Sequence, residues 1–160
     1  MAEQGAGWRP EAVIFTGVQA SGKSTFYRER FFETHVRISM DMLRTRRRES
    51  LLLNACILAR QPFVVDNTNP LAADRARYVQ PARAAGFRVA GYVFRATPAQ
   101  AIARNRPRTG RAAVPIPGIL ATWKRMEEPR IEEGYDVLYS VTLTDANLYV
   151  VEELARAAPG

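Results

Sequence analysis

The sequence predicts an α/β protein with a doubly wound, five-stranded parallel sheet flanked by helices. Five short stretches of strand-forming residues alternate with stretches of helical spacing, which is the pattern of βαβ units. Several of the strand candidates are continuously apolar, as expected when helices cover both faces of a sheet. The 160 residues contain no internal repeat and no low-complexity segment, so we expect a single domain over residues 1–160 with its core over about 12–143.

The strands are predicted from short apolar runs bounded by turn residues. The first run, AVIFT, precedes a glycine-rich turn, and the third, FVVD, ends in an acidic residue. The predicted strands span residues 12–16, 36–39, 63–66, 88–94 and 136–143.

The helices are predicted from apolar spacing and from residues that start or stop helices. Pro70 stands at the start of one helix and Gly86 just past its end, which are positions that these residues favour. Residues 106–114 are rich in arginine and interrupted by Pro107 and Gly110, so we expect a loop there. The predicted helices span residues 24–32, 41–60, 70–85, 98–106 and 116–128, with a short one over 150–158.

The composition excludes several classes of protein. A single cysteine, Cys56, rules out an internal disulfide framework and a cysteine-based zinc site, and it fits a reducing compartment. No apolar run reaches the roughly 18 residues that a membrane span needs. We therefore expect a soluble, cytoplasmic protein that has no membrane partner, and the sequence indicates no protein partner either.

The charge is unevenly placed along the chain. There are 23 Lys and Arg against 16 Asp and Glu, a net charge of +7, and all but two of the basic residues are arginine. Residues 1–111 hold 19 basic and 8 acidic side chains, whereas residues 112–160 hold 4 and 8. A basic region of this kind suits a polyanion such as a nucleic acid. Solvated surface charge is the alternative explanation for the basic region, and a GC-rich coding sequence is the alternative explanation for the excess of arginine over lysine.

The most specific motif is the run GVQASGKS, residues 17–24, which matches G-x-x-x-x-G-K-[ST]. It follows a predicted strand and opens a predicted helix, as a phosphate-binding loop requires, and its glycines let backbone N–H groups turn toward phosphate oxygens. We expect Lys23 to reach the β- and γ-phosphates of a nucleotide and the Ser24 hydroxyl to ligate Mg²⁺. The nucleotide-binding candidates are Gly17, Gln19, Ala20, Ser21, Gly22, Lys23, Ser24 and Thr25.

Asp41 follows the second predicted strand. In a doubly wound sheet, ligands bind beyond the carboxyl ends of the strands, so Asp41 is expected to share a crevice with the loop at residues 17–24. A carboxylate there can accept the proton of an attacking hydroxyl. A helix N-cap is the structural alternative, and it is compatible with catalysis. Arg44, three residues later on the predicted helix, is expected on the same helical face, where it could hold a substrate phosphate, whereas Arg46–Arg48 suit a solvated or loosely phosphate-binding run.

The third predicted strand ends in Asp66, and the segment DNTNP follows the pattern of a strand-to-helix turn. Asp66 could act on Mg²⁺ through water or orient the side chains of the loop. Asn67 and Asn69 are further candidates for substrate binding, with a capped turn as the alternative.

Four arginines crowd the segment after the fourth predicted strand. They are Arg104, Arg106, Arg108 and Arg111. Small kinases close an arginine-bearing segment over the triphosphate, which neutralises developing charge and excludes water. We therefore expect a lid over about 104–114, with Arg104 and Arg108 as phosphate ligands and Arg106 as the alternative to Arg108. A basic surface loop is the structural alternative.

Two longer stretches resemble the kinase domain of polynucleotide 5′-hydroxyl kinases. Residues 65–86, VDNTNPLAADRARYVQPARAAG, are similar to the kinase domain of animal polynucleotide kinase-phosphatase. Residues 104–126, RNRPRTGRAAVPIPGILATWKRM, are similar to the lid and the following helix of the phage polynucleotide kinase. The resemblance covers residues 12–143 and implies a P-loop kinase fold with an arginine-bearing lid.

The resemblance also implies roles for individual residues. Lys23 and Ser24 would bind the donor triphosphate and Mg²⁺, and Asp41 would be the general base on the 5′-hydroxyl. Arg44 would contact the phosphate next to the acceptor nucleoside, and Arg104 and Arg108 would contact the donor phosphates. The catalytic candidates are thus Lys23, Asp41 and Arg108.

Three functions follow from these features. The first is transfer of the γ-phosphate of ATP or another NTP to the 5′-hydroxyl of DNA or RNA. The second is a small-molecule kinase of the P-loop class that acts on a metabolite, sugar or nucleoside hydroxyl. The third is a non-catalytic NTP-binding module, which Asp41 disfavours because a switch needs no acceptor base.

Overall fold

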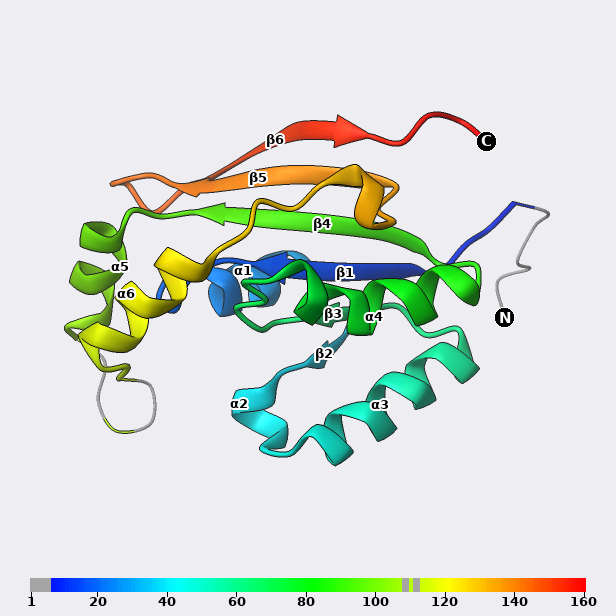
Figure 1. Cartoon of the computed structure of the whole chain (residues 1–160), viewed down its shortest axis with the longest axis horizontal. Coiled ribbons are helices and arrows are strands. Elements are labelled where there is room, and N and C mark those ends of the chain that lie inside the picture. Colours follow the sequence, from blue (N-terminus) through cyan, green and yellow to red (C-terminus); the bar gives the residue numbers. More distant parts are fainter. Residues whose placement is uncertain (1–6, 108–109, 111–112) are drawn as a thin grey trace.

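A six-stranded sheet forms the centre of the computed structural model, which describes residues 7–107, 110 and 113–160. The strand order is β2-β3-β1-β4-β5-β6, and the first five strands run parallel (Figure 1). The strands are β1 (Glu11–Thr16), β2 (Val36–Ile38), β3 (Phe63–Val65), β4 (Arg88–Arg95), β5 (Val137–Leu143) and β6 (Tyr149–Arg156). The predicted parallel α/β arrangement is confirmed for the five predicted strands.

Helices cover both faces of this sheet. They are α1 (Lys23–Arg30), α2 (Met40–Leu43), α3 (Arg46–Ala59), α4 (Ala72–Ala84), α5 (Pro98–Asn105) and α6 (Ile116–Arg125), with a 3₁₀ turn, η2, at Ile131–Glu133. Figure 1 shows α5 and α6 beyond the carboxyl end of β4, where the sheet carries its ligand-binding edge in doubly wound folds.

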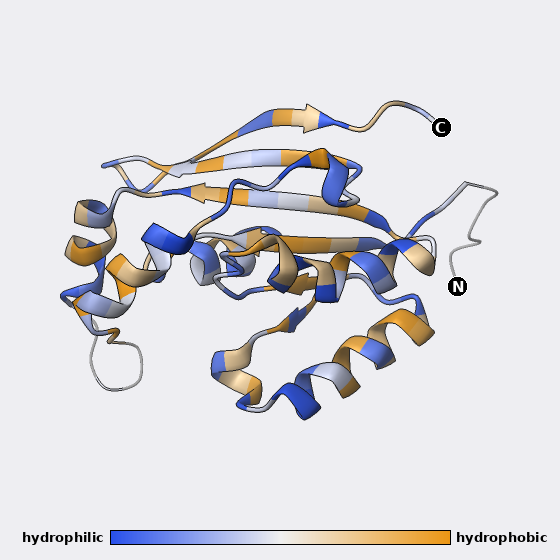
Figure 2. Cartoon of the chain, in the orientation of Figure 1, coloured by the Kyte–Doolittle hydropathy of each residue, from blue (hydrophilic) through white to orange (hydrophobic). Residues whose placement is uncertain are grey.

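The alternation of side chains along β1 explains the two layers. Ala12 and Ile14 pack in one buried cluster with residues of α3 and α4, whereas Val13 and Phe15 pack in another with residues of α1. All four side chains are fully buried, and Figure 2 shows the apolar course of β1. The continuous apolar run is therefore the mark of a strand that is covered on both faces.

The predicted helix over residues 150–158 is wrong. This segment forms β6, which pairs antiparallel with β5 and adds a sixth strand to the sheet. Tyr149 and Val151 pack against the cluster over α1, whereas Val150 and Glu152 are exposed, which is the period-two pattern of an edge strand. The short run was too ambiguous in sequence to distinguish the two periods.

The predicted continuous helix over residues 41–60 is also wrong. It is two helices, because α2 ends at Leu43 and Arg44 has a positive φ of 72°. The Thr45 hydroxyl then accepts a hydrogen bond from the backbone N–H of Arg48 (3.2 Å) and caps α3. Arg44 consequently does not share a helical face with Asp41.

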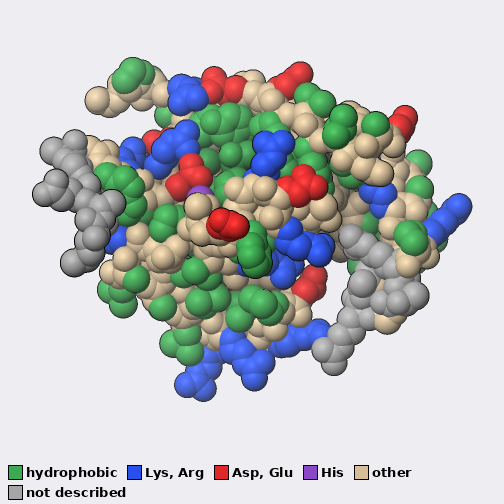
Figure 3. Space-filling view, turned by 180° about the vertical axis from the view of Figure 1, so that it is seen from behind, with side chains coloured by type: hydrophobic (Ala, Val, Ile, Leu, Met, Phe, Trp, Pro, Cys, Tyr) green, Lys and Arg blue, Asp and Glu red, His purple; other side chains and the backbone are tan. Residues whose placement is uncertain are grey.

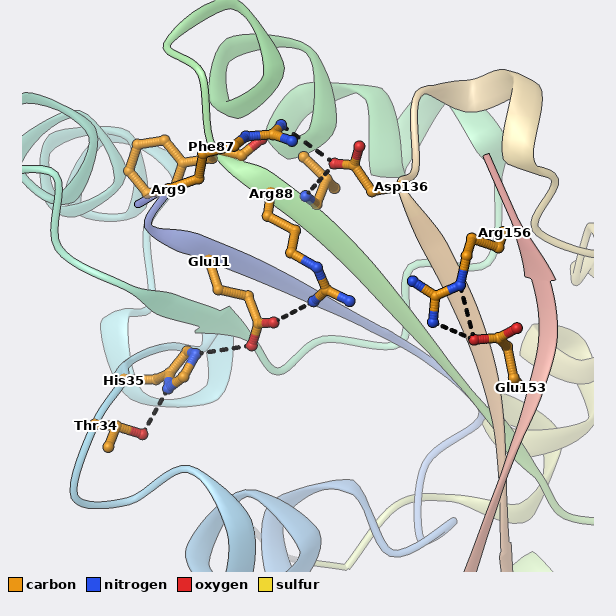
Figure 4. A network of polar contacts seen from close by, with 10 residues as sticks. Arg9, Glu11, Thr34, His35, Phe87, Arg88, Asp136, Glu153 and Arg156 are labelled. Carbon is orange, nitrogen blue, oxygen red and sulfur yellow. Dashed lines mark hydrogen bonds and ion pairs between the residues drawn. The ribbon is translucent and has the colours of Figure 1, made fainter. Parts of the chain in front are cut away.

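Ion pairs join the strands at the amino end of the sheet (Figure 4). Glu11, at the start of β1, accepts hydrogen bonds from His35 (3.1 Å) and from Arg88 at the start of β4 (2.5 Å). Burial alone would raise the pKa of Glu11, but the hydrogen bonds and charges of His35 and Arg88 outweigh it and lower that pKa. Asp136, just before β5, accepts from the backbone N–H of Val89 (2.8 Å). The charged groups at this end satisfy one another.

Candidate functional site

The glycine-rich loop between β1 and α1 is closely packed. A Cβ atom on Gly17 would lie 2.8 Å from the Cβ of Phe94 and 2.9 Å from Ser21 Oγ, so no larger residue fits there without a shift. Gly22, at a φ of 96°, ends the loop, and α1 begins at Lys23. The backbone N–H of Gly17 donates to the carbonyl of Thr68 (3.0 Å), which ties the loop to the segment after β3.

The Lys23 side chain is buried within its own loop. Its ammonium donates to the carbonyl oxygens of Gly17 (2.8 Å) and Val18 (2.6 Å) and contacts Ser21 Oγ (3.3 Å). Only 8% of Lys23 is exposed. The positive charge is therefore held among the atoms that would surround a bound phosphate.

Two further contacts hold the loop from the outside. The Gln19 amide donates to Thr122 Oγ1 on α6 (3.1 Å). The Tyr149 hydroxyl on β6 donates to the carbonyl of Gly22 (2.8 Å), and a Cβ atom on Gly22 would lie 3.1 Å from that hydroxyl. Sequence reasoning missed Tyr149 because the segment that follows it, residues 150–158, was expected to be helical, so no strand was expected at Tyr149.

Ser24, Asp66 and Arg37 form a compact polar group beside the loop. The Ser24 hydroxyl donates to Asp66 Oδ2 (2.9 Å), and Arg37 Nε donates to the same oxygen (2.8 Å). Arg37 Nη2 also donates to Ser24 Oγ (3.2 Å). Arg37 comes from β2 and was missed because a charge within a strand carries no motif.

Asp41 lies in the same cleft as the loop. The cleft has a volume of about 710 Å³, and its lining includes Lys23, Ser24, Asp66 and Asp41. Asp41 is exposed in the first turn of α2, so its carboxylate is open to a ligand. Within the described part of the chain, it has no hydrogen bond or ion pair.

Asn67 supports the backbone beside Asp41 through a buried polar network. Its Oδ1 accepts from the backbone N–H of Met40 (2.9 Å), and its amide donates to Glu49 Oε2 (3.1 Å) and to the Tyr78 hydroxyl (3.2 Å). Glu49, only 1% exposed, also accepts from Tyr78 (3.0 Å) and Arg46 (2.7 Å). Helix α3 and helix α4 thus fix the entry into α2.

Asn69 is engaged within the fold as well. Its amide donates to the carbonyl of Phe15 (2.8 Å), and the residue is 4% exposed. Its carbonyl accepts from Arg75 (2.9 Å), which is fully buried and paired with Glu133. Asn69 therefore holds the segment after β3 against β1.

The described lining of the cleft contains arginines that the sequence did not single out as site residues. Arg28, Arg46 and Arg125 belong to its lining, whereas Arg44 does not. Burial alone would lower the pKa of Arg46, but the hydrogen bond from Arg46 to Glu49 and the nearby Tyr78 outweigh it and raise that pKa. Arg46, which the sequence placed in a solvated or loosely phosphate-binding run, is therefore a charged residue of the cleft lining.

The predicted lid is described only in part. Arg104 donates to the carbonyl of Leu143 at the end of β5 (3.2 Å) and is not in the cleft lining, and Arg106 is exposed just after α5. Arg108 and Arg111 lie outside the described residues. The Asn105 side chain donates to the carbonyl of Val114 (2.6 Å) and accepts from its N–H (3.0 Å), which brings the two ends of the segment together.

These features define a P-loop NTPase with a kinase-like fold: a parallel sheet, a glycine-rich loop that leads into α1, and acidic residues after β2 and β3. A family model for an AAA domain matches residues 13–131, and the chain belongs to this family of P-loop NTPases. In the described residues, no helix has both the length and the apolar character needed to cross a membrane.

Three solved structures share the fold at low sequence identity. A chain of the Pnkp1/Rnl/Hen1 RNA repair complex is 20% identical with a TM-score of 0.65, over 79% of this chain and 47% of that one. Kti12 of Chaetomium thermophilum, in complex with ADP-AlF3, is 16% identical with a TM-score of 0.62, over 85% and 92%. AvrRxo1-ORF1:-ORF2 with ATP is 12% identical with a TM-score of 0.67, over 91% and 58%. This chain thus spans about half the length of the first and third matches.

Proposed function

We propose that the protein transfers the γ-phosphate of ATP or another NTP to the 5′-hydroxyl of a nucleic acid, as one kinase domain with its core over residues 12–143. The observation that carries this proposal is the position of Asp41, which lies in one cleft with Lys23 and Ser24. An exposed carboxylate beside a phosphate-binding loop can accept the proton of an attacking hydroxyl.

The donor nucleotide binds along the loop from Gly17 to Thr25. Lys23 neutralises phosphate charge, and the helix N-terminus of α1 adds a favourable partial charge. Arg104 and Arg108 remain the proposed lid ligands of the donor phosphates. Nucleotide complexes of two structural neighbours, with ADP-AlF3 and with ATP, are in keeping with this role.

A hydroxyl and a carboxylate beside the loop suit Mg²⁺, which prefers oxygen donors and binds through few protein ligands together with substrate phosphates. Ser24 Oγ and Asp66 Oδ2 are 2.9 Å apart and would hold it, with Ser24 as the direct ligand. The metal would neutralise phosphate charge during transfer.

The acceptor hydroxyl lies at Asp41 in this proposal. Arg44 remains the proposed contact for the adjoining phosphate, and Arg46 is a second candidate because it lines the cleft. Asn67 and Asn69 act by positioning, since their side chains bond to Met40 and Phe15. A run of basic side chains along the lower edge of the molecule in Figure 3, the edge that α3 forms in Figure 1, suits a polyanionic acceptor. The match to an RNA repair complex is in keeping with this substrate class.

A small-molecule kinase is the second candidate. The observation that favours it is the absence of Arg44 from the described lining of the cleft, because a metabolite hydroxyl requires no contact to a neighbouring nucleotide.

Radiolabelled ATP, offered with 5′-hydroxyl DNA and RNA oligonucleotides and with a panel of metabolites, distinguishes these candidates. We expect label in an oligonucleotide. A labelled metabolite together with unlabelled oligonucleotides would replace the first proposal by the second, and nucleotide binding without any transfer would leave a binding module.

A further inference from the structure

Arg37 makes the contacts that a metal ion would be expected to make. Its neighbours Val36 and Ile38 pack with the cluster over α3 and α4, so alternation along β2 turns Arg37 to the face of α1. There its guanidinium donates to Ser24 Oγ (3.2 Å) and Asp66 Oδ2 (2.8 Å). These are the two oxygens that fit a divalent cation.

A guanidinium and a divalent cation at these oxygens oppose each other. A metal ion bound to Ser24 Oγ needs a lone pair of that oxygen. Arg37 Nη2 already donates a hydrogen bond to this oxygen, so the two compete for it. The two cations also repel, and the repulsion is strong because Asp66 is buried and screening by water is weak there. Asp66 supplies a single negative charge, which Arg37 already balances.

The described part of the chain offers no other metal cage. No group of three or more His, Cys, Asp or Glu side chains suited to a metal occurs in the described residues 7–107, 110 and 113–160. The remaining ligands of a metal ion would therefore be phosphate oxygens and water. Phosphate also brings the negative charge that lets a second cation approach.

We propose that Arg37 is the built-in counter-cation of the Ser24–Asp66 pair and excludes free divalent metal from the nucleotide-free protein. Divalent metal enters this site together with the nucleotide, as the metal–NTP complex. The inference rests on the proposed nucleotide and metal site, but it requires neither a particular acceptor nor catalysis. Arg37 thereby makes metal binding at this site dependent on the nucleotide.

Titration with Mn²⁺ as the probe tests this inference, with free Mn²⁺ followed by electron paramagnetic resonance and no nucleotide present. Removal of the charge in Arg37→Gln is expected to tighten Mn²⁺ binding by at least about tenfold. Ser24→Ala in the Arg37→Gln background is expected to abolish that gain. Arg28→Gln removes the same charge from the lining of the adjoining cleft and is expected to alter Mn²⁺ affinity by less than about threefold, because Arg28 donates to the backbone carbonyl of Ser24 and to neither Asp66 nor Ser24 Oγ.

Unchanged Mn²⁺ affinity in a folded Arg37→Gln variant would overturn the inference, as would tight Mn²⁺ binding by the unaltered protein without nucleotide. Circular dichroism checks the fold. Arg37→Lys keeps the charge and is expected to keep metal binding weak, so a gain in this variant equal to that of Arg37→Gln would also contradict it. A separate titration with ATP alone reports whether the nucleotide site itself exists, which keeps the two failures apart.

Discussion

The two ends of the parallel sheet carry similar charged groups but use them differently. At the amino end, Glu11 bonds to His35 and Arg88, and the charges are satisfied within the protein. At the carboxyl end, Asp41 is exposed in a cleft that also contains Lys23 and Ser24. In both places an acid stands beside a strand, so the residue types alone do not separate structure from function.

The direction of the strands explains the difference. The parallel strands β1 to β4 each lead from their carboxyl ends into a loop and a helix, so loops and helix N-termini converge at that edge, whereas β5 leads into β6. The helix α1 begins there at Lys23, and α2 begins at Met40. At the amino end, by contrast, the chain comes back from the helices to begin the next strand, and ion pairs between neighbouring strands stabilise this end of the sheet. Substitutions at the carboxyl end should therefore change activity, whereas substitutions at the amino end should change stability.

The largest expected effect follows from Asp41→Asn. Loss of the proposed general base should lower phosphoryl transfer by about 10²–10⁴-fold. ATP affinity and the melting temperature should stay close to their original values, because the Asp41 side chain is exposed and makes no hydrogen bond or ion pair with another described residue. Transfer rates with saturating ATP, compared with those of Glu11→Gln at the other end, provide the measurement. Full activity in Asp41→Asn would remove this residue from the mechanism.

The next effect concerns Glu49→Gln. The Glu49 carboxylate accepts hydrogen bonds from Asn67 and Tyr78, whereas the amide of the variant places a donor against one of them. Asn67 then holds the backbone N–H of Met40 less firmly. We expect the free energy of unfolding to fall by about 1–3 kcal/mol. We expect kcat to fall about tenfold, with little change in ATP affinity. Ser50→Ala, at the exposed next position of α3, is the matched control. A fall in stability without a fall in kcat would assign Glu49 to the fold alone.

A smaller effect is expected from Glu11→Gln and should appear only in stability. Because the folded pKa of Glu11 lies below its ordinary value of 4.5, the carboxylate stabilises the fold above that value, and the contribution disappears as the pH falls through the depressed pKa. At pH 7 we expect a loss of about 1 kcal/mol, discounted for partial exposure. Urea unfolding at pH 7 and below pH 4 measures it, and a difference that stays constant with pH would contradict the assignment.

The smallest effect is expected from Tyr149→Phe. The variant loses one hydrogen bond to the Gly22 carbonyl, which is worth about 0.5–1.5 kcal/mol, and ATP affinity should fall by no more than about tenfold. Tyr92→Phe makes the same change on β4 and should leave ATP affinity unchanged. Equal effects of the two variants on ATP titrations would show that the Tyr149 contact does not position the loop.

Much of the fold follows from local sequence patterns. Three elements each have a signal within a few residues: the strand before GVQASGKS, the strand FVVD and the helix between Pro70 and Gly86. The segment that forms β6 does not, because a short amphipathic run fits two periods and only its pairing with β5 decides between them. The break at Arg44 depends likewise on the cap that Thr45 makes.

The candidate site was predictable where a motif or strand end marks it. Asp41 and Asp66 follow strands, so the chain order alone brings them to the edge of the loop. Arg37, Glu49 and Tyr149 are placed by the pairing of strands and by the packing of helices, and nothing in their immediate sequence distinguishes them from structural residues. These three residues of the site are therefore identified by contacts between distant segments and not by sequence motifs.

The central claim, transfer to a 5′-hydroxyl, is tested most directly with two oligonucleotides of one sequence that differ only at the 5′ end. One carries a 5′-hydroxyl and the other a 5′-phosphate, and each is incubated with the protein, Mg²⁺ and γ-labelled ATP. We predict label only in the 5′-hydroxyl strand, removable by a phosphatase and absent with Asp41→Asn. Equal labelling of both strands, or release of inorganic phosphate with neither strand labelled, would contradict the claim.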